Sequence, residues 1–179
     1  MNHFPNIRKV IHIFLCFHWK ISEVYGKLMN KIRREGIIIN YLLVSPNFPT
    51  SQESFARKLI EKGVKVLGIG SENYDNLTDG LKNSLTEYYK VNDLENYDEV
   101  LRGVAFLIYK HGVIDRVESN NEYWLTLDSI IREQFNIPGV KPKNLDFTKY
   151  KSKMKERFIK ANVPVAKGRA VKNIKELEK

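Results

Sequence analysis

The sequence predicts an α/β fold with a doubly wound, mainly parallel sheet of four strands, Rossmann-like in arrangement. Between residues 37 and 140, β-rich apolar runs alternate four times with segments of helical periodicity. This alternation is typical of parallel sheets with right-handed crossover helices. The first run, 37–44, is almost continuously apolar, as expected for a strand that is covered on both faces. The 179 residues suffice for one such domain with extensions at its ends.

The first strand, 37–44, is followed by the turn 46–49 and a helix. Thr50 and Glu53 stand in capping-box spacing at the start of that helix, and Gly63 is placed to end it. The apolar residues expected on its buried side are Phe55, Leu59 and Ile60.

The later elements follow the same alternation. Strands are predicted at 64–69, 86–91 and 114–118, and a short helix at 77–84. Asn96 is placed to cap a longer helix at 97–111, and Gly112 to terminate it. Its expected buried stripe is Val100, Val104, Leu107 and Ile108. Ser119 and Glu122 repeat the capping-box spacing, and predict a helix through Trp124, Leu127, Ile130 and Ile131 to about Phe135.

The positive charge lies at the two ends of the chain. Residues 1–36 carry a net +5, residues 37–140 a net −5 and residues 141–179 a net +9. Neither basic end interleaves aromatic residues with cations as single-strand binders do. Nucleic acid is therefore an unlikely partner. The single cysteine, Cys16, excludes an internal disulfide framework and a multi-cysteine zinc site, and it favours a cytoplasmic protein.

Residues 1–36 form a basic extension that matches no element of the fold. The run 10–19 is apolar and follows Arg8 and Lys9, but two histidines interrupt it and no cleavage site follows. It is about half as long as a membrane span. We expect no membrane span, and an amphipathic or poorly ordered extension. Alternatively, translation begins at Met29.

Residues 141–179 change character after the sheet domain. A lysine-rich connector leads to a helix predicted at about 147–161, and 162–165 begins an extended segment. We interpret 141–179 as a connector and the first elements of a following domain, which ends before it could close a core of its own.

Ser119, Asn120, Asn121 and Glu122 follow the fourth strand, at the sheet edge where ligands bind in open α/β folds. They are the candidate site that the residue pattern alone offers. Helix capping alone also accounts for Ser119 and Glu122.

Five stretches resemble one family. They are 44–49, 63–70, 85–91, 119–124 and Met154-Lys155 with 161–165. Together they are similar to the pre-ATP-grasp domain of carbamoyl-phosphate-synthase-like ATP-grasp ligases, over about residues 40 to 172. The last stretch resembles the helix that leads into the ATP-grasp domain. Asn162 stands where that family usually has glycine, and Tyr150-Lys151 occupies its Asp-Lys position.

The resemblance implies a role for three residues. Lys151 is expected to contact ATP phosphates, and Asn121 and Glu122 match an Asn-Glu pair near the substrate cleft between two domains. No catalytic residue and no metal ligand can be carried over. The full enzymes use ATP and magnesium to join a small-molecule carboxylate to an amine or another nucleophile through an acyl-phosphate.

The resemblance therefore predicts the N-terminal fragment of an ATP-grasp carboxylate ligase, inactive alone and without tight ATP or magnesium binding. Its partner would be a downstream ATP-grasp domain that is missing or separately encoded. Two other functions remain open: a small-molecule-binding or regulatory α/β domain, and an interaction protein that uses its basic termini.

Overall fold

The computed structural model describes residues 38–168, together with 171 and 174. The chain divides into two compact units, 1–38 and 39–179, and all described residues except Ile38 belong to the second. The basic extension 1–36 and Met29 lie outside the described residues.

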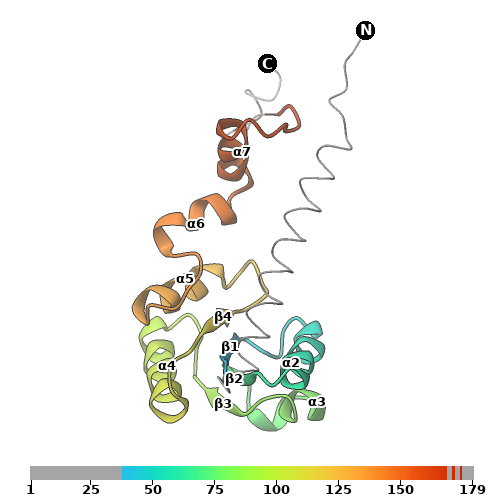
Figure 1. Ribbon diagram of the computed structural model, residues 1–179, viewed down its shortest axis with the longest axis vertical. Helices are drawn as coiled ribbons and strands as arrows, with labels where there is room; N and C mark the ends of the chain where they lie inside the picture. Colours follow the sequence, from blue (N-terminus) through green and yellow to red (C-terminus); the bar gives the residue numbers. More distant parts are fainter. Residues whose placement is uncertain (1–37, 169–170, 172–173, 175–179) are drawn as a thin grey trace. The chain divides into compact units, whose positions relative to one another are not determined.

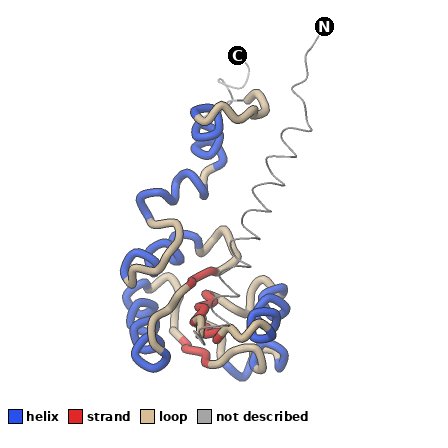
Figure 2. The backbone as a smooth tube through the Cα atoms, viewed as in Figure 1, coloured by secondary structure: helices blue, strands red, loops and turns tan. Residues whose placement is uncertain are grey.

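Four parallel strands form one sheet in the order β3-β2-β1-β4. The strands are β1 (Asn40–Val44), β2 (Lys65–Gly70), β3 (Glu87–Lys90) and β4 (Arg116–Glu118). Figure 1 shows α2 and α3 on one side of this sheet and α4 and α5 on the other, and Figure 2 shows the strands between these helices. The predicted α/β, doubly wound parallel fold is confirmed, and each predicted strand lies within a few residues of the observed one.

The central strand, β1, explains the long apolar run near the start of the domain. It pairs with β2 from Asn40 opposite Lys65 to Val44 opposite Ile69, and with β4 along Tyr41 to Leu43. Leu42, Leu43 and Val44 are fully buried. A strand covered on both faces needs apolar side chains at successive positions, and the sequence supplies them.

Helix α2 (Ser51–Glu61) begins differently from the prediction. Thr50 has helical backbone angles and its side chain makes no capping hydrogen bond, so the predicted capping box is wrong. The side chain of Glu53 instead accepts a hydrogen bond from Thr78 Oγ1 at 2.6 Å, 25 positions along the chain. The buried residues of α2 are Gln52 and Ala56, while Phe55 and Ile60 are exposed. The predicted buried face of α2 is therefore rotated around the helix axis from the observed one, which contains Gln52 and Ala56.

The connection from β2 to β3 is short and mostly polar. A 3₁₀ turn (Tyr74–Asn76) precedes α3 (Asp79–Lys82), which is shorter than the predicted 77–84. Thr78 caps α3 by accepting a hydrogen bond from the Leu81 N–H at 3.2 Å. Helix α2 packs against both α3 and β2.

Helix α4 (Tyr97–His111) matches its prediction at both ends. The Asn96 side chain accepts from the Glu99 N–H at 3.2 Å, and Gly112 ends the helix with a positive φ of 88°. Gly103 faces the sheet, where a Cβ would lie 2.7 Å from the Tyr89 ring and 2.9 Å from Ile69. The helix can therefore approach β2 and β3 closely only with glycine at this position.

Helix α5 (Leu125–Gln134) follows β4 after a six-residue loop. Its N-cap is Trp124, so the predicted Ser119/Glu122 capping box is wrong. The main core packs α4 and α5 against the sheet through fourteen buried residues. They are Leu42, Val44, Leu67, Ile69, Val91, Leu94, Val100, Val104, Leu107, Ile114, Val117, Leu127, Ile131 and Ile137.

The segment after the sheet contains two helices rather than the single predicted one. Helix α6 (Pro142–Lys149) has proline at its first position, where the missing N–H is harmless. Tyr150 is extended, and α7 (Lys151–Lys160) begins directly after it. Helix α7 has no buried residue, and Arg157 stacks on the Phe147 ring at 3.6 Å. Within the described residues, no helix is long and apolar enough to cross a membrane.

Candidate functional site

The strand order places the direction change of the sheet between β1 and β4. From β1 the chain moves outward to β2 and β3, then returns to the other side of β1 to form β4. Ligands of open α/β sheets bind at the carboxyl ends of the strands where this change occurs. The segments at these ends are the turn after Val44 and the loop after Glu118, which we call the 119–122 loop.

Both strand ends turn sharply. Ser45, directly after β1, has a φ of 52°, and so does Asn120 in the 119–122 loop. Asparagine tolerates this left-handed conformation better than most residues. Ser119 is fully buried and its hydroxyl oxygen accepts from the Asn121 N–H at 3.4 Å. The loop is therefore folded back tightly over the end of β4.

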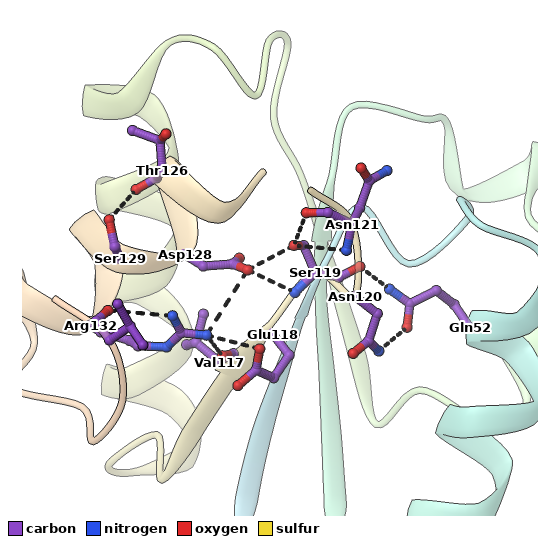
Figure 3. Close-up of polar contacts among 11 residues, drawn as sticks. Gln52, Val117, Glu118, Ser119, Asn120, Asn121, Thr126, Asp128, Ser129 and Arg132 are labelled. Carbon is purple, nitrogen blue, oxygen red and sulfur yellow. Dashed lines mark hydrogen bonds and ion pairs between the residues drawn. The ribbon is translucent and has the colours of Figure 1, made fainter. Parts of the chain in front are cut away.

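Gln52 links α2 to the 119–122 loop (Figure 3). Its Nε2 donates to the Ser119 carbonyl oxygen, and its Oε1 accepts from Asn120 Nδ2 at 3.0 Å. Gln52 is almost fully buried, so both polar ends of its amide need these partners. The amide fixes the spacing between the start of α2 and the loop after β4.

Asp128 holds the same loop from the opposite side. Its Oδ2 accepts from the Ser119 hydroxyl at 2.7 Å and from the Ser119 N–H at 3.1 Å. Asp128 is completely buried and its Oδ1 has no hydrogen-bond partner. Burial raises the pKa of this carboxyl to about 6, even though the hydrogen bonds from Ser119 and the charge of Arg132 oppose the shift.

Arg132 supplies the positive charge next to Asp128. Its guanidinium donates to the Val117 carbonyl at 2.6 Å and to Glu118 at 2.9 Å, and lies 4.0 Å from Asp128. The buried cation is thus shared between two carboxylates and a backbone oxygen, which offsets much of its desolvation. Arg132 also lies against Gly139, where a Cβ would meet its side chain at 2.6 Å. It therefore ties β4 and α5 to the turn that follows.

The structure places Asn121 and Glu122 on the outer part of the loop. The Asn121 Oδ1 accepts from the Tyr123 N–H at 2.9 Å, a local turn contact that leaves its amide nitrogen available. Glu122 is exposed, and no hydrogen bond to it is recorded within the described residues. The two predicted cleft residues thus belong to one loop, which Gln52 and Asp128 hold in place.

Lys151 lies at the first position of α7 and is exposed. Within residues 38–168, no recorded contact joins it to Asn121 or Glu122, so the structure does not bring the three predicted residues together. Lys155, one turn further along, donates to the Gly168 carbonyl at 3.0 Å. The first turn of α7 holds no acidic side chain and has no side-chain cap. Its free N–H groups and Lys151 can meet a phosphate there.

Three residues of this site escaped the sequence analysis: Gln52, Asp128 and Arg132. A signal for Asp128 was present, because it falls on the same helical face as Leu127 and Ile131, where an apolar side chain is expected. Gln52 occupies the equivalent position on α2, one turn before the buried Ala56. A polar residue inside an apolar stripe is the pattern that indicates such buried partners.

This arrangement of side chains positions the 119–122 loop and has little chemical reactivity of its own. In the part of the chain that the structure describes, no three His, Cys, Asp or Glu side chains gather to hold a metal ion. The loop, held by Gln52 and Asp128, can present the Asn121 amide and the Glu122 carboxylate to a polar ligand.

Neither known family models nor curated proteins match this sequence. Among solved structures, the chain is similar to the L-amino acid ligase from Bacillus licheniformis, with a TM-score of 0.50 and 15% sequence identity. The match covers 78% of this chain and 40% of the ligase chain. At this identity the match shows a shared fold alone, and this chain spans less than half the length of the protein it matches.

Proposed function

We propose that this chain supplies the N-terminal part of an ATP-grasp ligase that joins a carboxylate to an amine. The observation that carries the proposal is the structural likeness to an L-amino acid ligase over 78% of the chain. Because that likeness covers 40% of the ligase chain, the proposal assigns catalysis to a further domain, either continuous with this chain or separately encoded.

Two parts of this chain have roles in the proposal. The 119–122 loop, held by Gln52 and Asp128, presents Asn121 and Glu122 toward the carboxylate or amine substrate. Lys151, at the uncapped start of α7, binds an ATP phosphate together with the free N–H groups of that turn. ATP, when bound, supplies the phosphoryl group that activates the carboxylate. The residues described here include no magnesium ligand set, so the ion is assigned to the further domain.

The test compares the chain alone with the chain fused in register to its downstream reading frame. ADP release that depends on added L-amino acids is expected from the fusion and not from the chain alone. Turnover by the chain alone, abolished by a substitution within residues 37–179, would overturn the proposal.

A matched pair of lysine variants tests the phosphate contact in the active fusion. A hydrogen bond to a charged group contributes about 1.5–3 kcal/mol, so Lys151→Ala should raise the KM for ATP roughly tenfold or more. Lys153→Ala, two positions along the same helix and also exposed, is the control and should leave this KM nearly unchanged. An equal rise in the KM for ATP in both variants would show that Lys151 acts only through the general positive charge of the helix.

A further inference from the structure

The hydroxyl of Ser119 lies between two hydrogen-bond acceptors at the end of β4. Its Oγ is 2.7 Å from Oδ2 of Asp128 and 3.2 Å from the backbone carbonyl oxygen of Asn121. Figure 3 shows Ser119 between these two residues. A hydroxyl has a single proton, so it donates to one of the two oxygens at a time. Which oxygen accepts depends on the charge of Asp128.

When Asp128 is ionised, the hydroxyl of Ser119 donates to the carboxylate. An ionised oxygen is the stronger acceptor, and hydrogen bonds to it are shorter than those to neutral groups. The distances of 2.7 Å to Asp128 and 3.2 Å to the Asn121 carbonyl agree with this order. In this state the Asn121 carbonyl receives no hydrogen bond from the hydroxyl.

When Asp128 takes up a proton, one of its two oxygens is the favourable position. Oδ1 is buried and has no hydrogen-bond partner within the described residues, so a proton there would be a buried donor without an acceptor. A proton on Oδ2 faces the Ser119 oxygen at 2.7 Å. That oxygen can accept it and keep the bond from the Asn121 N–H, because a hydroxyl oxygen accepts two hydrogen bonds. The hydroxyl proton then points to the Asn121 carbonyl.

The charges that act on Asp128 come from its own helix and from β4. Arg132, one turn further along α5, lies 4.0 Å from Oδ2 and favours the ionised carboxyl, whereas Glu118 in β4 favours the protonated one. Glu118 also pairs with Arg132 at 2.9 Å, so the charge of the arginine is shared between two carboxylates. Complete burial has the largest effect and raises the pKa of Asp128 to about 6. Both protonation states are therefore populated close to neutral pH.

The other elements packed around α5 bring no recorded charge contact to Asp128 within the described residues. The buried residues of α2, α4 and α6 are uncharged. Two lysines reach α5 after its end, but Lys149 donates to Thr126 and Lys141 to the Arg132 carbonyl. The protonation state of Asp128 is therefore set within β4, the 119–122 loop and α5.

We infer that Ser119 is a hydrogen-bond relay, which reverses when Asp128 takes up a proton and then donates to the Asn121 carbonyl. Acidification thus adds a hydrogen bond between the first and third residues of the 119–122 loop, and deprotonation removes it. The meaning of this switch for substrate presentation rests on the proposed function. The relay itself is a property of this chain and is tested without ATP, substrate or a further domain, so it can fail while the proposed function stands.

The experiment follows two carbon signals of the full chain, labelled with ¹³C and ¹⁵N, between about pH 4 and pH 8. The carboxyl carbon of Asp128 reports its protonation, and the backbone carbonyl carbon of Asn121 reports whether its oxygen accepts a hydrogen bond. Both signals are expected to move with one midpoint, near the pKa of about 6. An Asn121 signal that stays constant while Asp128 titrates would overturn the inference, as would an Asp128 that stays ionised throughout.

Three variants separate the relay from a direct effect of charge. Ser119→Ala removes the hydroxyl and should abolish the pH response of Asn121 while Asp128 still titrates. Asp128→Asn does not titrate and should abolish the same response. Ser129→Ala is the matched control, because it removes a neighbouring buried hydroxyl that donates to the Thr126 carbonyl at 2.7 Å, and both signals should still move together. An Asn121 response that persists in Ser119→Ala or in Asp128→Asn would refute the relay.

Discussion

Asp128→Asn should remove the part of the pH dependence of folding stability that comes from titration of this carboxyl. The wild-type carboxyl is completely buried, and burial raises its pKa from 3.8 to about 6. The folded protein therefore holds this proton more tightly than the unfolded chain does. The stability that the protonated group provides is fully present below the unfolded pKa and is lost as pH rises through about 6.

The size of the effect follows from the shift. One pKa unit corresponds to about 1.36 kcal/mol, so the carboxyl accounts for roughly 3 kcal/mol in total. Most of this is lost between about pH 4 and pH 7. An asparagine oxygen can still accept from the Ser119 hydroxyl and N–H, which preserves the loop, and the amide does not titrate.

The assay is urea unfolding of both proteins at several pH values across this range. The stability of Asp128→Asn relative to wild type should rise by about 2–3 kcal/mol from pH 4 to pH 7. Glu118 and Arg132, the charged neighbours of Asp128, remain in both proteins. Glu133→Gln, on the exposed side of the same helix, is the control. Parallel stability curves for wild type and Asp128→Asn would refute the reasoning.

Two further substitutions probe the packing around the sheet. Gly103→Ala places a methyl group 2.7 Å from the Tyr89 ring and should destabilise the fold by about 1–3 kcal/mol. The control, Ala105→Gly on the exposed side of α4, should cost no more than about 1 kcal/mol. Equal losses of stability in urea unfolding would contradict the close approach of α4 to the sheet. Gln52→Ala leaves the Ser119 carbonyl and the Asn120 amide without their partner and should cost about 1–3 kcal/mol. The loop should open more often, which is measured as faster amide exchange in residues 119–122, and unchanged exchange would show that Gln52 does not hold the loop.

Elements whose ends depend on local sequence were predicted well. Asn96 and Gly112 bound α4 as expected, because an N-cap side chain and a positive-φ glycine act within one turn of the backbone. The strands were located because a buried parallel strand requires a continuous apolar run.

Elements whose side chains have distant partners were predicted less well. The spacing of Thr50 with Glu53, and of Ser119 with Glu122, is that of a capping box, but Glu53 binds Thr78 and Ser119 binds Asp128. A local pattern cannot show which of two partners a side chain uses. The division between α6 and α7 at Tyr150 was missed because the lysine-rich segment has little apolar periodicity to define a helix. The strand order, which places β4 beside β1 and so creates the site, is not encoded in any single stretch.

The position of β1 in the sheet also has a consequence for synthesis on the ribosome. One edge of β1 pairs with β2, which begins soon afterwards in the chain, but the other pairs with β4, which is complete only at Glu118. Until that residue has emerged, a nascent chain that has assembled β1, β2 and β3 leaves the apolar strand Asn40–Val44 with an unpaired edge. Such an edge is a template for pairing with another chain. In the interval between translation of β2 and of β4, this edge of β1 is therefore open to pairing with another chain.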